Sequence, residues 1–165
     1  MGSTNLGKAV YCNPIDDVEY CIREILKQKK TPEVETFEIG HTWTMARLME
    51  KYDFADPVLF SVVLGHEGEA PATPQALAAM IQMIPSNAVW GITQAHGKDF
   101  SLLAGALGMG ARTVRIGFED SNYLDAQTQV TSNAPLVEKT VKLLRAMDKE
   151  PMLPDEAREL FRIGR

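Results

Sequence analysis

The sequence V-L-F-S-V-V-L at residues 58–64 lies between Pro57 and Gly65 and is apolar at all positions except Ser61. A short apolar run without alternation is typical of a strand buried on both faces, as in a parallel sheet covered by helices. Similar patterns on either side predict three more strands, at residues 33–39, 88–93 and 113–119. Helical patterns separate them, at residues 16–30, 42–52, 74–83, 100–109, 134–147 and 154–161. The chain therefore alternates strands and helices, which indicates an α/β fold.

Four strand–helix units fit two architectures within a single domain over residues 1–165. One is a small doubly wound sheet, and the other is half of a (β/α)8 barrel. A complete barrel takes about 200 residues or more, which excludes it here. Gly105, Gly108 and Gly110 lie in or after a helical pattern rather than between a first strand and its helix, so they form no dinucleotide fingerprint.

The composition is that of an ordinary globular domain, with 45% hydrophobic and 24% charged residues. A net charge of −5 without a basic stripe argues against nucleic-acid binding. No apolar run approaches the length of a membrane span. Cys12 and Cys21 lack the spacing of a zinc or redox motif, which favours reduced thiols and a cytoplasmic protein.

The stretch T-V-R-I-G-F-E-D at residues 113–120 carries the charges that suit a site. Strand alternation would place Arg115, Gly117 and Glu119 on one face, and Asp120 follows directly. A cation and a carboxylate on one face, separated by a glycine, leave room for a ligand between them. The same pattern also fits a strand end held by salt bridges, so both interpretations stay open.

Six blocks of the chain together resemble one family. They are P-E-V-E at 32–35, G-H at 40–41, V-L-G at 63–65, V-R-I-G-F-E-D at 114–120, S-N-A-P-L-V-E at 132–138 and P-D-E-A-R-E-L at 154–160. They occur in the same order in the β-keto acid cleavage enzymes, the family of 3-keto-5-aminohexanoate cleavage enzyme. That family folds as a (β/α)8 barrel, so the resemblance implies that this chain is the C-terminal half-barrel, with strands 5 to 8 and their flanking helices.

The resemblance implies an activity and its residues. The family condenses a β-keto acid with acetyl-CoA and releases acetoacetate and a new acyl-CoA. It binds zinc or another divalent metal through two histidines of an H-x-H strand, which the resemblance assigns to the N-terminal half, and one glutamate, which matches Glu119. Arg115 and Asp120 match its catalytic pair, and Glu35 matches a position that contacts the substrate. A solvated carboxylate at a strand end is the alternative for Glu35.

Two further histidines follow expected strands, and the loop around one of them departs from the family pattern. His66 and His96 follow expected strands, but they lack the close spacing of a metal motif. The run T-Q-A-H-G-K at 93–98 stands where the family carries a glycine-x-glycine-arginine run, which leaves coenzyme contacts there in question.

We expect the isolated chain to be inactive for lack of the two histidines, and to pair with an N-terminal half-barrel or with itself. The alternative is a non-catalytic, doubly wound binding or regulatory module. The order of the strands separates the two, because a half-barrel keeps sequential neighbours and a doubly wound sheet reverses direction.

Overall fold

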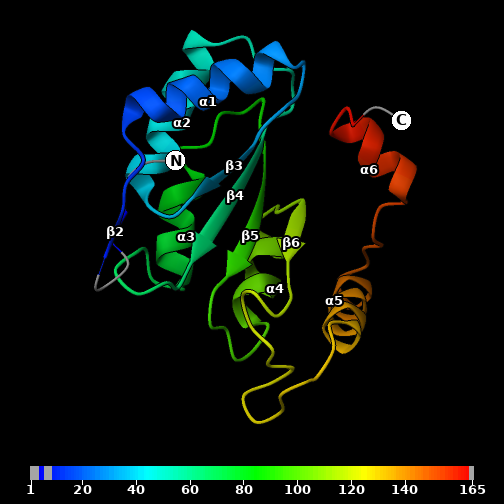
Figure 1. Cartoon of the computed structure of the whole chain (residues 1–165). Helices are drawn as coiled ribbons and strands as arrows, with labels where there is room; N and C mark the ends of the chain where they lie inside the picture. Colours follow the sequence, from blue (N-terminus) through cyan, green and yellow to red (C-terminus); the bar gives the residue numbers. More distant parts are fainter. Residues whose placement is uncertain (1–3, 6–8, 164–165) are drawn as a thin grey trace.

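The expected strands form one parallel sheet in chain order. The computed structural model describes residues 4–5 and 9–163. The other residues of the domain expected over 1–165 lie outside the described part. Strands β3 (Glu33–Thr36), β4 (Leu59–Leu64), β5 (Val89–Gln94) and β6 (Thr113–Arg115) pair as neighbours in this order, and every pair is parallel (Figure 1). The order contains no reversal, so it does not match the doubly wound alternative and is consistent with half of a barrel.

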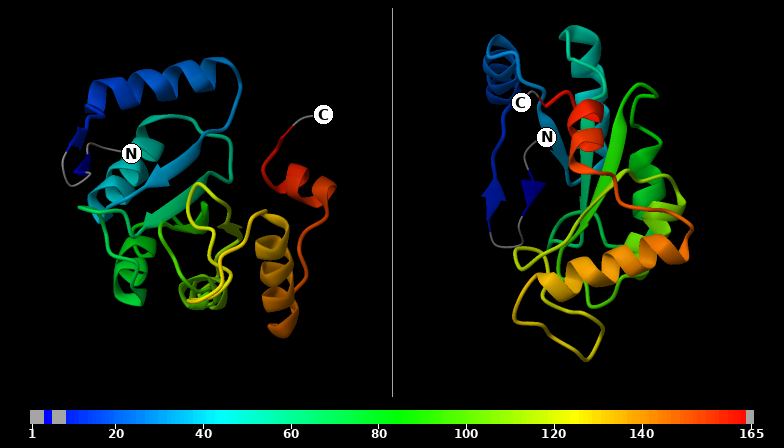
Figure 2. Two further views of the ribbon diagram at one scale, coloured as in Figure 1. Left: turned by 60° about the horizontal axis from the view of Figure 1, so that its bottom comes forward. Right: turned by 90° about the vertical axis from the view of Figure 1, so that its right-hand side faces the viewer.

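Helices alternate with these strands. They are α1 (Ile15–Lys27), α2 (Ile39–Lys51), α3 (Pro74–Ile81), α4 (Ser101–Gly108), α5 (Ala134–Ala146) and α6 (Pro154–Leu160). In the left panel of Figure 2, α3, α4 and α5 follow one another along the helix-covered side of the sheet. Within the described ranges, no helix combines the length and the apolar character that crossing a membrane requires. A short antiparallel hairpin of β1 (Thr4–Asn5) and β2 (Val10–Tyr11) precedes α1, and the sequence pattern does not predict it.

The two faces of the sheet differ in chemistry. Registered neighbours share a face in a parallel sheet, so Phe60 lies beside Val34 and Val62 beside Ile92. These apolar side chains are at most 2% exposed, and they pack against residues of α1 to α4. Glu35, Ser61, Thr93 and Arg115 occupy the alternate positions on the opposite face. The charged side chains of the described strands therefore lie on the side away from the helices.

The boundary between β3 and α2 differs from the expectation that Gly40 ends a longer strand. The strand stops at Thr36, and the backbone N–H groups of His41 and Thr42 both donate to the Glu38 carbonyl, at 3.0 and 3.2 Å. Ile39 and Gly40 therefore belong to the first turn of α2. The first N–H groups of a helix have no partner within it, so a glycine there weakens the helix less than one in its middle.

The last strand is also shorter than expected, because β6 ends at Arg115. Gly117 has φ +147°, a region that side chains with a Cβ rarely adopt, and the chain turns there. Its carbonyl accepts the N–H groups of Asp120 and Ser121 at 3.0 and 2.8 Å. Arg115, Gly117 and Glu119 therefore do not share one strand face, and Phe118 is 47% exposed instead of packing in the core.

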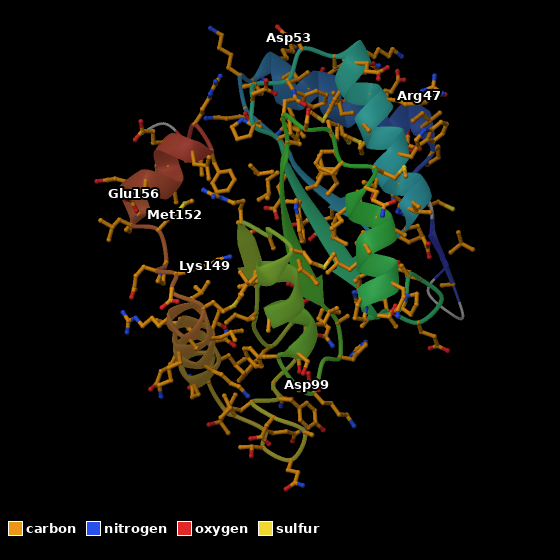
Figure 3. The ribbon with its side chains drawn as sticks, turned by 180° about the vertical axis from the view of Figure 1, so that it is seen from behind. Arg47, Asp53, Asp99, Lys149, Met152 and Glu156 are labelled. Carbon is orange, nitrogen blue, oxygen red and sulfur yellow. The ribbon has the colours of Figure 1, made fainter. Side chains whose placement is uncertain are left out.

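The carboxyl ends of the strands lie at one end of the molecule. Figure 3 places Asp53, which precedes β4, and Asp99, which follows β5, at opposite ends. The chain from the end of α5 into α6 lies beyond the β6 edge of the sheet, as the labels of Lys149, Met152 and Glu156 show in Figure 3. No described residue of α6 is buried.

Candidate active site

The turn after β6 folds Asp120 back onto Arg115. The Arg115 guanidinium donates from Nε to Oδ2 of Asp120 at 3.0 Å and from Nη2 to Oδ1 at 2.7 Å. Parallel paired contacts of this kind fix the orientation of a carboxylate and are among the stronger hydrogen bonds in proteins. The Asp120 side chain is 5% exposed, whereas that of Arg115 is 38% exposed. The turn therefore holds a buried carboxylate and a partly accessible cation at a fixed distance and orientation.

A second carboxylate reaches the same guanidinium from the opposite edge of the sheet, on the same face. Nη1 of Arg115 donates to Oε1 of Glu35 at 2.8 Å. Glu35 lies on β3 and Arg115 on β6, the two outer strands of the sheet. Three strand spacings separate them, which is about 14 Å in a flat sheet. The two long side chains meet across a face on which Ser61 and Gly91 lie in register with Glu35 and leave room for them.

The two carboxylates hold Arg115 in its charged form. The hydrogen bond to Asp120 raises the pKa of Arg115 most, and the negative charges of Asp120, Glu35 and Glu119 add to this effect against the cost of partial burial. Arg115 is therefore a permanent cation that can stabilise negative charge but cannot accept a proton. Asp120 is the group of this pair that can act as a base.

The loop after β5 supports the turn that carries Asp120. The N–H of His96 donates to the Asp120 carbonyl at 2.8 Å. The Ser121 hydroxyl donates to the Gly97 carbonyl. These contacts tie two loops at the carboxyl ends of neighbouring strands.

Arg115 and Asp120 both line a hollow between these loops. Its other walls are polar and apolar side chains from β5, α4 and the following segments, among them Gln94, Asp99, Phe100, Leu103, Tyr123 and Leu136. Its volume is about 30 Å³, so in this chain alone the hollow holds about one water molecule, although it sets a few polar groups against apolar walls. The arrangement can remove a proton from a bound carbon acid and stabilise the charge that develops.

Glu119, the expected metal ligand, is exposed at the same turn, close enough to Arg115 to influence its pKa. Catalytic zinc usually takes three protein ligands. Over residues 4–5 and 9–163, no group of three or more His, Cys, Asp or Glu side chains could hold a metal ion. The described part of this chain therefore lacks the three protein ligands of a catalytic zinc site, and Glu119 as one ligand of such a site stays a prediction.

The structure brings the histidines together, which their spacing in the sequence does not predict. The rings of His66 and His96 lie 5.7 Å apart and nearly perpendicular, at 86°. Phe37 contacts the rings of both His41 and His66, at 6.3 and 6.2 Å. The signal that could have found this cluster is their shared place after successive strands, because those ends meet at one edge of a parallel sheet.

The sequence of this chain matches that of a family of enzymes. The family model described as beta-keto acid cleavage enzyme matches residues 1–163, so the chain belongs to this family.

Individual relatives share the match over almost the whole chain. A 3-keto-5-aminohexanoate cleavage enzyme of Acetoanaerobium sticklandii is 30% identical over 165 residues, which are 99% of this chain and 60% of the relative. A protein of the same name from Fusobacterium nucleatum is 30% identical over 161 residues, covering 97% of this chain and 58% of the relative. A 3-dehydrocarnitine:acetyl-CoA trimethylamine transferase of Rhizobium meliloti is 29% identical, over 96% of this chain and 52% of its own length. The chain thus spans about 60% or less of these relatives.

Proposed function

We propose that this chain supplies strands 5 to 8 of a (β/α)8 barrel, as one domain over residues 1–165, and forms part of an acetyl-CoA-dependent β-keto acid cleavage enzyme. The observation that carries the proposal is the Asp120–Arg115–Glu35 network at the carboxyl ends of the strands, where barrel enzymes place their active sites. The names of the relatives, which include acetyl-CoA transferases, support the reaction class.

Asp120 is the base in the proposed mechanism. It takes a proton from the carbon between the keto and carboxylate groups of the β-keto acid, and Arg115 stabilises the negative charge of the resulting enolate. The enolate attacks the thioester carbonyl of acetyl-CoA and releases the coenzyme thiolate. The thiolate then attacks the original keto carbon, and cleavage of the carbon–carbon bond gives a new acyl-CoA and the enolate of acetoacetate. This enolate takes the proton back from Asp120, which yields acetoacetate and restores the base. Arg115 keeps Asp120 oriented throughout, because both carboxylate oxygens accept its hydrogen bonds.

Glu35 and Glu119 complete the proposed set. Glu35 contacts the substrate in this proposal. Because Glu35 also pairs with Arg115, a cationic distal group of the substrate would share the Glu35 carboxylate with the guanidinium. Glu119 is one metal ligand in the assembled enzyme, with imidazoles from the other half. The metal would be zinc or a similar divalent ion, which polarises carbonyl groups when bound.

The proposed partner is an N-terminal half-barrel chain or a second copy of this chain. Strands β3 and β6 each have one neighbour within the described sheet, which leaves an outer edge on each. Such edges pair readily with another strand. Both cysteines of the chain are free thiols, which supports a reducing, cytoplasmic location.

The test is reconstitution. We expect no acetoacetate from a β-keto acid and acetyl-CoA with this chain alone, and turnover when a chain carrying strands 1 to 4 is co-expressed with it. In the assembled enzyme, Asp120→Asn should retain metal and lower kcat at least 100-fold, while Glu119→Gln should lose metal. The exposed Glu138→Gln is the matched control, because Glu138 forms its ion pair with Lys142 along α5, away from the Arg115 network.

Two results would contradict the proposal. Turnover by the chain alone would refute the dependence on a second half. An assembled, metal-bound complex without turnover would favour the non-catalytic module.

A further inference from the structure

Two imidazoles outside the proposed catalytic set face each other at the carboxyl ends of β4 and β5. His66 is half-buried and His96 is exposed, so solvent reaches the pair. Their ring centroids lie 5.7 Å apart. We propose that His66 and His96 together bind a late first-row divalent cation such as Zn²⁺, Ni²⁺ or Cu²⁺. The inference is independent of the proposed catalytic role of Arg115 and Asp120.

The separation of the two rings is close to that of imidazoles sharing one metal ion. A metal–nitrogen distance of about 2.0–2.1 Å places each ring centroid about 3.2 Å from the ion. At a tetrahedral angle the two centroids would then lie about 5.2 Å apart. The observed separation exceeds this by about 0.5 Å, and the rings meet in an edge contact at 86°, so binding requires the side chains to turn until a nitrogen of each ring points to the ion.

The backbone already holds both residues near each other. A Cβ on Gly65, next to His66, would lie 2.8 Å from the carbonyl oxygen of Ala95, next to His96, so the two strand ends approach closely. The N–H of Ala95 also donates to the Leu64 carbonyl at 2.9 Å. Binding a cation here therefore carries no free-energy cost for bringing the two loops together.

Each histidine is also fixed by its own loop. The N–H of Glu69 donates to the His66 carbonyl at 3.2 Å, and the ring of Phe37 packs against the His66 ring. His96 adopts φ +56°, a left-handed conformation that few side chains favour, and its N–H is bonded to the Asp120 carbonyl. Both side chains thus start from defined backbone positions.

The chemistry of the pair selects the class of cation. Imidazole nitrogen suits zinc, copper and nickel, whereas Mg²⁺ and Ca²⁺ take oxygen ligands. His41 does not join the pair as a ligand, because it is buried and its Nδ1 accepts the N–H of Phe37 at 3.4 Å. Two imidazoles and water would complete the coordination. Such a cation would join the loop after β4 to the loop after β5.

The test uses the full chain and Ni²⁺ alone as the probe. Cys12 and Cys21 are exposed thiols that can bind soft metals, so Cys12→Ser with Cys21→Ser is the background for every variant. Titration calorimetry gives the stoichiometry and the dissociation constant. Histidine ring signals in NMR show directly which imidazoles contact the paramagnetic ion.

The expected result is one Ni²⁺ per chain, with broadening of the His66 and His96 ring signals ahead of those of His41. His66→Asn and His96→Asn should each weaken binding at least tenfold, and the double variant should be no weaker than either single one, because both ligands act as one chelate. Asparagine is chosen since it tolerates the left-handed conformation at position 96. The exposed Glu67→Gln is the control and should bind as the background does.

Three outcomes would overturn the proposal. They are affinity retained within twofold in either histidine variant, additive losses in the double variant, and loss of binding in Glu119→Gln instead. The last result would place the cation at the turn after β6. Thermal unfolding of each variant without metal verifies that the fold is intact, so reduced binding cannot be attributed to an unfolded chain.

Discussion

Replacing Asp120 with asparagine should destabilise this chain much more than replacing Glu35 with glutamine. Asp120 is 5% exposed and accepts two hydrogen bonds from Arg115, at 3.0 and 2.7 Å. An asparagine keeps one acceptor and turns an NH₂ group towards an N–H of the guanidinium. Losing one hydrogen bond to a charged group costs about 1.5–3 kcal/mol. Because Arg115 is itself 38% exposed, solvent screens part of this loss, and we expect about 2 kcal/mol.

Glu35 provides the matched comparison, since it pairs with the same guanidinium in a more exposed place. Both side chains of that ion pair are 38% exposed, and exposed pairs contribute about 0–1 kcal/mol. Urea unfolding of the chain at pH 7 measures both losses. A double-mutant cycle with Arg115→Met should give a coupling of at least about 1 kcal/mol to Asp120. Equal losses for the two carboxylates, or a negligible coupling to Asp120, would refute this account of the network.

Two other predictions concern packing and pH. Gly91→Ala should lower the free energy of unfolding in urea by about 3 kcal/mol, because the added Cβ would lie 1.8 Å from Oγ1 of Thr113 and push β5 away from β6. Gly105→Ala is the control: its added Cβ would have open space, so this variant should leave the stability unchanged or stabilise α4. Burial first, and then the charge of Glu69, raises the pKa of Glu38 above 4.5. The native state therefore disfavours the charged form, so Glu38→Gln should stabilise the chain at pH 7. This advantage should fade as the pH falls through the raised pKa and be lost once the pH is below 4.5; an equal gain in unfolding free energy at pH 7 and at pH 4 would contradict the prediction.

The order of the elements could be predicted from the sequence because the two central strands are short apolar runs near proline or glycine, and helical patterns separate the four expected strands. The run at 58–64 became β4 with a shift of one residue at its start. The family resemblance supplied the barrel-like interpretation, and the sequential strand order agrees with it. Alternation alone misled at residues 116–119, where the backbone of Gly117 leaves the extended region. A pattern of side chains does not reveal that change of direction.

The candidate site was predictable only where it is local. Arg115 and Asp120 lie five residues apart, and the sequence suggested their association. The contact of Glu35 with Arg115 forms because their side chains reach towards each other across the two strands between β3 and β6. The contact of His66 with His96 forms because the loops after β4 and β5 approach each other. Neither has a fixed spacing along the chain that a motif could capture.

The same difference in spacing gives the two contacts of Arg115 different places in the folding of the chain. The bond to Asp120 closes a segment of five residues, whereas the bond to Glu35 closes one of 80 residues. If loop closure follows chain length, the longer contact costs about 2.5 kcal/mol more in chain entropy. The Arg115–Asp120 pair can therefore form as soon as its turn does, and the bond to Glu35 forms only when β3 and β6 are both in place. A spectroscopic probe at Glu35 would thus report completion of the sheet, while one at Asp120 would report an early local turn.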